Sequence, residues 1–117
     1  MISFPANTDI FISHRPVSFG CGIDGMLRYC RIILQKEPLS EAYFMFINKG
    51  GEQIRVLWYD GQGFSLCIKR SSQGRFSNWP KNSEDIYSVF SFFHAQILFS
   101  GGDPKALKSK KIWKKIT

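Results

Sequence analysis

Nine acidic residues are the first candidates for chemistry, because clustered carboxylates can hold the two metal ions, about 4 Å apart, that phosphoryl-transfer enzymes use. They are Asp9, Asp24, Glu37, Glu41, Glu52, Asp60, Glu84, Asp85 and Asp103. Most of them stand at expected turns or element ends. Asp24 suits a helix N-terminus, and Asp60 suits a turn whose amides it can accept from. We therefore expect structural roles, no metal site and a protein that is not an enzyme.

The remaining reactive side chains lack a partner motif. The cysteines Cys21, Cys30 and Cys67 include no close pair, which argues against a disulfide framework and against a C-x-x-C site. We expect them to be small, partly buried side chains, although Cys21 could lie just before a helix. His14 and His94 belong to no recognisable sequence motif, and no glycine-rich phosphate loop is present. The sequence thus predicts no cofactor.

A group of four cations with two aromatic residues among them is the candidate for nucleic-acid binding. The cations are Lys69, Arg70, Arg75 and Lys81, and the aromatic residues are Phe76 and Trp79. Basic side chains neutralise phosphates, and aromatic rings stack on unpaired bases. The alternative is a solvated sheet end with both rings in the core. No helix-turn-helix or zinc-finger pattern is present, so we expect weakly specific DNA binding, and the same residues would also suit RNA.

The C-terminal segment, 104–117, carries most of the net charge of +7. Its six lysines and no acids contribute +6, while residues 1–103 contribute only +1. The lysines are Lys105, Lys108, Lys110, Lys111, Lys114 and Lys115. We assign the last five of these lysines to the nucleic-acid-binding set. Such a block suits a nucleic-acid arm, or it is a solvated, frayed end.

The central element that positions these cations is a hairpin around Asp60. Apolar, β-branched and aromatic runs flank the short Gly-containing turn 60–63, which indicates two antiparallel strands. If Asp60 faces Gly63, then Tyr59 faces Phe64, and the pairing continues to Ile54 with Lys69. A one-residue slip would exchange the two faces of the sheet, so this register can be tested.

Further patterns predict the other elements. We expect a short strand at 10–12, a long helix from 23 that ends by Glu37 before Pro38, and a strand at 42–48. A turn at 49–52 leads into the hairpin, and a fourth strand is expected at 75–79. Residues 86–89 are expected to form an edge strand. Ser91 is the expected N-cap of a short helix that Gly101-Gly102 ends.

These elements predict an α+β fold: an antiparallel β-meander of four to five strands with one long N-terminal and one short C-terminal helix. At 117 residues, we expect a single domain, 1–103, and a basic tail, 104–117. No run approaches the roughly 20 apolar residues of a membrane span. The N-terminus also lacks the pattern of a signal peptide. We therefore expect no membrane contact and a cytoplasmic location.

Five sequence blocks resemble the TnpB-type accessory protein of bacterial insertion-sequence family sixty-six, the product of the second reading frame of those elements. The blocks are G-I-D-G at 22–25, the strand at 43–48, L-W-Y-D-G-Q-G-F at 57–64, K-R at 69–70 and G-R-F-x-x-W-P at 74–80. The resemblance as a whole runs in order from about Ile10 to Phe99, which is most of the chain. Two of the blocks, W-Y-D-G-Q-G-F and G-R-F-x-x-W-P, are specific in combination.

The resemblance implies an accessory role in transposition, with catalysis by a separate transposase; the family has no assigned enzymatic activity and no established molecular mechanism. Two functions are compatible with that role: DNA binding, or a protein-interaction module that binds the transposase or another element-encoded protein. For the second function, the expected contacts are Trp58, Tyr59, Asp60 and Trp79, because aromatic anchors dominate interfaces. The oligomeric state is not predicted.

The chain also departs from the family pattern in two places. Members typically carry D-M-R-K before the G-I-D-G block, whereas residues 18–21 here are S-F-G-C, without either charge. If that loop contacts DNA or a partner in the family, the contact is lost here. The lysine-rich end from Lys105 is also longer than is usual in the family.

Overall fold

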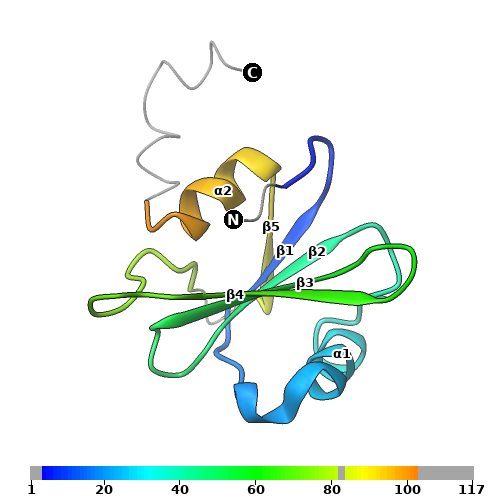
Figure 1. Cartoon of the computed structure of the whole chain (residues 1–117), viewed down its shortest axis with the longest axis horizontal. Helices are drawn as coiled ribbons and strands as arrows, with labels where there is room; N and C mark the ends of the chain where they lie inside the picture. The colour runs from blue at the N-terminus through cyan, green and yellow to red at the C-terminus, as the bar shows by residue number, and fades with distance from the viewer. Residues whose placement is uncertain (1–3, 82–83, 103–117) are drawn as a thin grey trace.

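The computed structural model describes residues 4–81 and 84–102, which form one sheet with a helix on each side (Figure 1). Its strands are β1 (Ile10–Ser13), β2 (Tyr43–Ile47), β3 (Gln53–Tyr59), β4 (Phe64–Arg70) and β5 (Tyr87–Phe90). Its helices are α1 (Gly22–Ile32) and α2 (Phe92–Phe99), with a 3₁₀ turn, η1 (Phe19–Cys21), before α1. The fold is therefore α+β, as predicted.

The strand order in the sheet is β4-β3-β2-β1-β5. Strands β2, β3 and β4 form the predicted antiparallel meander, with Tyr59 opposite Phe64 and Ile54 opposite Lys69 as expected. Strand β1 corrects the prediction of a purely antiparallel sheet, because it pairs parallel to β2 on one side and antiparallel to β5 on the other. A parallel pair needs a long crossover, and the segment that holds α1 provides it.

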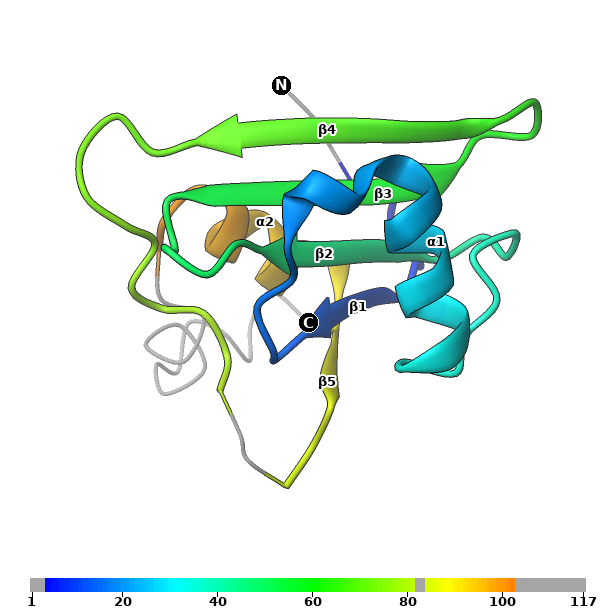
Figure 2. The same ribbon diagram turned by 90° about the horizontal axis from the view of Figure 1, so that it is seen from below.

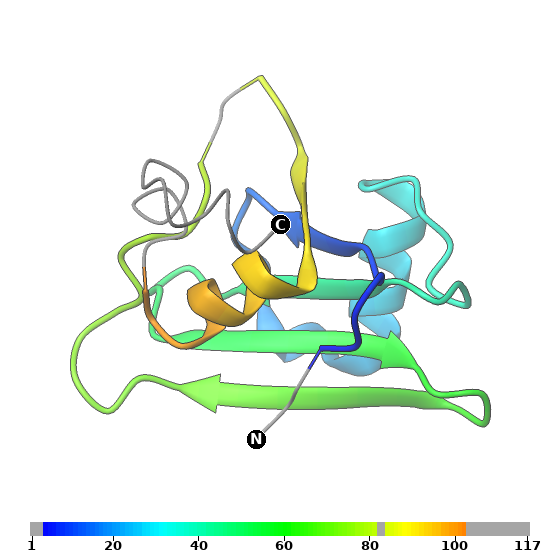
Figure 3. The same ribbon diagram turned by 90° about the horizontal axis from the view of Figure 1, so that it is seen from above.

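Each face of the sheet carries its own hydrophobic core. On one face, Ile12, Val56 and Met45 pack with Ala95 and Leu98 of α2. On the other face, residues of α1 pack against Phe44, Phe46 and Leu57. Alternating side chains of β2 and β3 thus go to opposite cores, and both faces are covered, as Figures 2 and 3 show from the two sides. The apolar run of β2 is explained by this double burial.

Helix α1 presents Met26, Leu27 and Cys30 to the sheet. The predicted long helix is shorter than expected. It has 11 residues and ends at Ile32, before Glu37, the last position that Pro38 would have allowed. The chain leaves the helix through Gln35, whose φ is 56°, and the amide of Lys36 donates to the carbonyl of Cys30. Asp24 lies in the first turn without a side-chain cap bond; Cys21 occupies the N-cap position.

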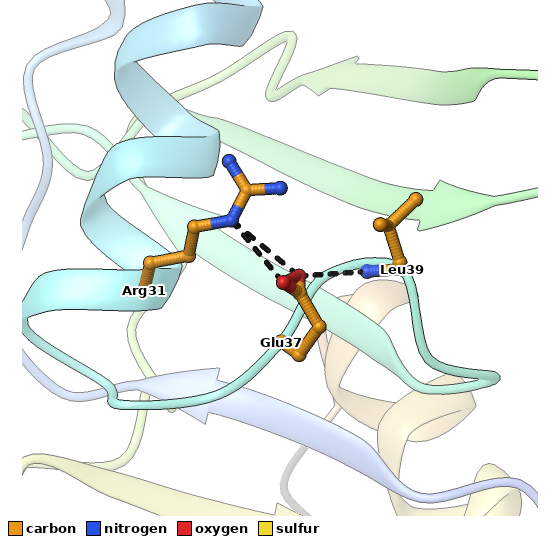
Figure 4. Close-up of polar contacts among 3 residues, drawn as sticks. All are labelled: Arg31, Glu37 and Leu39. Carbon is orange, nitrogen blue, oxygen red and sulfur yellow. Dashed lines mark hydrogen bonds and ion pairs between the residues drawn. The ribbon is translucent and has the colours of Figure 1, made fainter.

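A surface ion pair follows the end of α1 (Figure 4). Arg31 Nε lies 3.4 Å from both carboxylate oxygens of Glu37, and the Leu39 amide donates to Glu37 over 3.3 Å. Both charged side chains are about half exposed, so screening by solvent limits the pair to about 0–1 kcal/mol. Glu37 therefore helps to order the turn before β2.

The prediction of a fourth strand at 75–79 is wrong, because the segment 71–80 forms no strand. Instead it leaves β4 and folds back over the β2–β3 turn, where the Phe76 amide donates to the Gly51 carbonyl over 2.7 Å. Gly74 has a φ of 70°, which breaks the extended conformation before the segment could join the sheet. The predicted edge strand does form, as β5, one residue later than expected.

The His14 side chain, at the end of β1, bonds to the segment that contains β5. The imidazole Nδ1 donates to the Asp85 carbonyl over 3.0 Å, which leaves Nε2 to accept from the Ser88 hydroxyl over 2.6 Å. Since a carbonyl can only accept, this geometry sets the tautomer.

Ser91 is the N-cap of α2, with its hydroxyl accepting from the His94 amide as predicted. Helix α2 ends at Phe99, before Gly101-Gly102.

Two glycines of the G-I-D-G block are needed where the chain turns from η1 into α1. Gly22 has φ 68° and ψ −171°, a region that is essentially restricted to glycine. We expect Gly22→Ala to lower the free energy of unfolding by about 1–3 kcal/mol, measured by urea titration. Gly20→Ala is the matched control, because a Cβ there would meet only Ser18 Oγ at 3.8 Å; equal losses for both variants would contradict the assignment. Gly25 is needed for a different reason: a Cβ there would overlap the Cβ of Cys21.

Candidate nucleic-acid interface

Three of the predicted cations come together at the C-terminal end of β4, where a surface pocket of about 310 Å³ lies between β4, the following loop and the end of α2. We call this the β4 pocket. Its lining residues are Lys69, Arg70, Ser71, Ser72, Arg75, Phe76, Ser77, Ser100 and Gly101. The pocket thus combines positive charge with hydroxyl groups, both of which can bind phosphate oxygens.

Backbone and side-chain bonds hold the loop that forms one wall of the β4 pocket. The Ser71 amide donates to the Glu52 carbonyl over 2.8 Å, and Phe76 is held on Gly51 as described above. At the far end of the loop, the Trp79 indole Nε1 donates to the Ser13 carbonyl over 2.7 Å. Arg75 packs closely on Gly51: a Cβ added at Gly51 would lie 3.3 Å from the Arg75 side chain. The loop is therefore fixed at both ends.

The three cations of the pocket differ in what they contact. Lys69 Nζ donates to the Phe99 carbonyl over 2.7 Å and lies 4.8 Å from the centre of the Phe99 ring. This places its charge at the C-terminus of α2, where the helix dipole favours a cation. Arg70 and Arg75 are exposed, and within residues 4–81 and 84–102 neither has a carboxylate at ion-pair distance. The two arginines are therefore available to a ligand, whereas Lys69 joins β4 to α2.

The aromatic part of the predicted interface is not on the surface. Trp79 is only 5% exposed and belongs to the core below α2, and Phe76 is partly buried against the same core. This part of the structure fits the alternative that the sequence left open, in which both rings pack in the core beside a charged sheet end. Base stacking by Trp79 is thus excluded by its burial, and contacts to the phosphate backbone are the chemistry that this surface can provide.

The other predicted nucleic-acid contacts are placed as follows. Lys81 is exposed after Pro80 but does not line the β4 pocket. The tail residues Lys108, Lys110, Lys111, Lys114 and Lys115 lie outside the described residues, as does the predicted tail as a whole. Sequence reasoning missed the serines of the pocket, whose signal is the Ser71-Ser72 pair directly after Lys69-Arg70, and it missed the contribution of α2.

The residues predicted to contact a protein partner do not form one surface. Trp58 and Tyr59 are neighbours in β3, so they point to opposite faces of the sheet. Trp58 stacks on Tyr43 with ring centres 5.2 Å apart, and Tyr59 packs on Phe64 at 5.3 Å. Trp79 is 5% exposed in the core, so its ring offers almost no surface to a partner. Only Asp60 of this set is exposed.

Asp60 organises the β3–β4 turn as predicted. Its Oδ1 accepts from the amides of Gln62 and Gly63 over 3.0 and 2.9 Å, and its Oδ2 accepts from the Ser65 hydroxyl over 2.7 Å. These bonds, first that from the Gln62 amide and then that from Ser65, favour the ionised carboxylate and hold the pKa of Asp60 below its ordinary value of 3.8. Both carboxylate oxygens therefore take part in the turn.

The pH dependence of stability tests this role of Asp60. Because its pKa is lowered by folding, its bonds stabilise the fold above the unfolded value of 3.8, and this stabilisation is lost as the pH falls through the folded pKa. We expect Asp60→Asn to lose less stability than the natural chain between pH 7 and pH 3, measured as the shift of the urea midpoint. Glu41→Gln, at an exposed position, is the control. An unchanged pH dependence in Asp60→Asn would contradict the assignment.

The described residues hold no group of three or more histidine, cysteine, aspartate or glutamate side chains that could bind a metal ion. Of the cysteines, Cys30 is fully buried, and desolvation raises its pKa to about 12. Cys67 is partly buried, whereas Cys21 is exposed, unlike the partly buried side chain expected from the sequence. In the same described part of the chain, no helix is long and apolar enough to cross a membrane.

Comparison with known proteins finds relatives without an assigned activity. A family model described as "IS66 Orf2 like protein" matches residues 8–109. The uncharacterized protein y4hO of Sinorhizobium fredii (strain NBRC 101917 / NGR234) is 31% identical over 80 residues, which cover 68% of this chain and 69% of that protein. The uncharacterized protein y4jC of the same strain is 28% identical over 67 residues, or 57% of each chain. No solved structure matches.

Proposed function

Because this chain belongs to the IS66 Orf2-like family, we propose that it is a non-catalytic accessory protein of insertion-sequence transposition that acts by binding DNA. One observation carries the DNA-binding part: Arg70 and Arg75 are exposed at one pocket, with no carboxylate partner among the described residues. Two arginines without partners beside several hydroxyl groups are suited to phosphate, because the guanidinium binds phosphate oxygens in a bidentate manner.

The arrangement of the site supports DNA binding with weak sequence specificity. Base-specific reading usually requires a helix or a strand pair that enters a groove of the duplex. Helix α1 directs its apolar side to the sheet, and α2 packs on the opposite face. The β4 pocket is formed by a strand end and a loop, so it suits contacts to the phosphate backbone. Lys81 and the lysines of the C-terminal segment add positive charge to the chain for the same contacts.

A separate transposase would carry out the strand transfer. Support comes from two of the acidic residues, which serve structural roles: Asp60 in its turn and Glu37 in the ion pair with Arg31. No group of ligands for two metal ions is present among the described residues, and two-metal chemistry requires one. The proposal therefore assigns this protein to the binding of DNA and the chemistry to its partner.

The deciding experiment compares the full chain with a chain that ends at Asp103. Binding to the terminal sequence of the element and to a scrambled duplex is measured over a salt series by fluorescence anisotropy. We expect salt-sensitive binding that survives the truncation and differs little between the two duplexes. Binding that is lost with the truncation would assign the contact to the lysine segment alone. No binding by either chain would overturn the proposal.

A second candidate function is a protein-interaction module that binds the transposase. It is favoured by an apolar surface at α1, where Ile32 is 62% exposed beside a pocket of about 360 Å³ that Val17, Tyr29 and Ile33 help to line. Co-purification of the transposase with the full chain, abolished by Ile32→Asp, would support this function. It would be the preferred one if DNA binding fails.

A further inference from the structure

Strand β4 is a long and regular edge strand. Among the described residues, nothing pairs with its outer edge, and it is the outermost strand in Figure 2. Its seven residues pair one to one with β3, from Phe64 opposite Tyr59 to Arg70 opposite Gln53, so it contains no bulge. It also contains no proline. Proteins usually interrupt or shorten such edges because they pair with other chains, as the four-residue edge strand β5 illustrates.

The hydrogen bonds at the two ends of the β3–β4 hairpin show which backbone groups of β4 face outward. At one end the Asp60 amide donates to Gly63, and at the other the Ser71 amide donates to Glu52. Residues of an antiparallel pair alternate between bonding to the partner and facing away. Ser65, Cys67 and Lys69 therefore bond to β3. The amides and carbonyls of Phe64, Leu66, Ile68 and Arg70 point to the open edge.

We propose that β4 pairs antiparallel with β4 of a second copy of this chain, around a two-fold axis at Cys67. In this register, Phe64 lies opposite Arg70 of the second copy and Leu66 lies opposite Ile68. All four outward-facing residues then bond to outward-facing residues. Two bonds for each of the four pairs give about eight hydrogen bonds. The two sheets join into one continuous sheet.

Side chains on the α1 face match in this register. Ile68 is 51% exposed in the single chain, and in the dimer it packs against Leu66 of the second copy. The Arg70 guanidinium lies beside the Phe64 ring of the second copy, an arrangement that favours a cation–π contact. Cross-strand pairs of these kinds stabilise a sheet. The dimer thus covers an apolar side chain that the single chain leaves in water.

Charges on the two strands are also complementary. On the α2 face, Lys69 meets the small Ser65 of the second copy, so no like charges face each other. The turn with the ionised Asp60 lies at the end of the strand pair where the basic Arg70–Arg75 segment of the second copy begins. An acidic end therefore meets a basic end at both sides of the axis, which favours the antiparallel self-pairing over a parallel one.

Cys67 gives a test that depends on the register. The two Cys67 residues form a non-hydrogen-bonded pair on the axis, whose Cα atoms lie about 4.5 Å apart, within the range that a disulfide bridges. The test uses the full chain with Cys21→Ser, since Cys21 is exposed, whereas Cys30 is fully buried. Copper phenanthroline is added at several protein concentrations, and covalent dimer is quantified on a non-reducing gel.

The matched control moves the thiol by two residues on the same face, in the variant Cys21→Ser/Ser65→Cys/Cys67→Ser. Residue 65 faces Lys69 of the second copy, so we expect cross-linking at least about tenfold slower than with Cys67, because the sulfurs are no longer opposite each other. Equal rates for the two chains would overturn the proposed register and with it the proposal.

Sedimentation equilibrium of the full chain, without oxidant, measures the association itself. We expect a reversible dimer, and a dimer constant weakened at least about tenfold by Ile68→Asp, because the charge would be buried against Leu66. Circular dichroism checks that this variant, altered at an exposed side chain, is folded. A natural chain that stays monomeric at every concentration, or a dimer that Ile68→Asp leaves unchanged, would overturn the proposal. These outcomes do not depend on DNA binding.

Discussion

Replacing Trp79 with alanine is expected to lower the free energy of unfolding by about 3–5 kcal/mol, the range for a buried large aromatic side chain. Trp79 is 5% exposed and packs with Phe4, Ile12 and Ala95 in the core below α2. Its indole also donates to the Ser13 carbonyl. The substitution thus removes both the ring contacts and a hydrogen bond to a carbonyl of β1. Urea titration followed by circular dichroism measures the loss.

Two controls separate the parts of this effect. Trp79→Phe keeps most of the apolar volume and removes the indole hydrogen bond, so we expect a smaller loss of about 1–3 kcal/mol. Phe92→Ala removes a ring that is 39% exposed at the start of α2, and we expect it to cost less than either. If Trp79→Ala cost no more than Phe92→Ala, the loop 71–80 would not depend on the Trp79 anchor.

The double substitution Arg70→Ala/Arg75→Ala is expected to weaken DNA binding about 10- to 100-fold at low salt, if each arginine contacts one phosphate. The slope of log K against log salt concentration should fall by about 1.8, since each lost phosphate contact contributes roughly 0.9. Fluorescence anisotropy with a labelled duplex over a salt series measures both quantities. Lys69 is left in place because it contacts Phe99.

The matched control for charge is Arg28→Ala/Arg31→Ala. Both side chains are exposed on α1, on the opposite side of the sheet from α2 (Figure 1), and the net charge falls by the same amount. We expect the slope to change by less than half as much as in the first variant. Equal effects of the two variants would mean that DNA responds to total charge, and that the β4 pocket is not the contact.

Local patterns predicted the central hairpin in full. All six pairs from Ile54–Lys69 to Tyr59–Phe64 have the expected register. The reason is local: a short turn with Asp60 sets the first pair, and period-two alternation makes any slip costly. The N-cap at Ser91 and the end of α2 were predicted for the same kind of reason, because caps depend on residues only a few positions apart.

Contacts between distant residues explain what the sequence did not show. Strand β1 lies between β2 and β5, and its partners Tyr43 and Phe90 are 33 and 80 positions away from Ile10. The segment 75–79 has a strand-like composition, yet the Gly51 carbonyl and the Ser13 carbonyl provide its bonds. Neither bond has a local signature. Helix α1 ended early because Gln35 adopts a positive φ. The residues around Gln35 gave no signal for that conformation.

The sequence by itself determined the α+β class, the hairpin register, the turn role of Asp60 and the family resemblance, because each depends on neighbours along the chain. Only the tertiary structure decided which cations line one pocket. It joined Lys69 to the end of α2, left Arg70 and Arg75 exposed beside four serines, and placed Trp79 in the core. The physical reason is that burial and charge pairing depend on which distant segments pack together, and a residue type alone does not specify its neighbours in space.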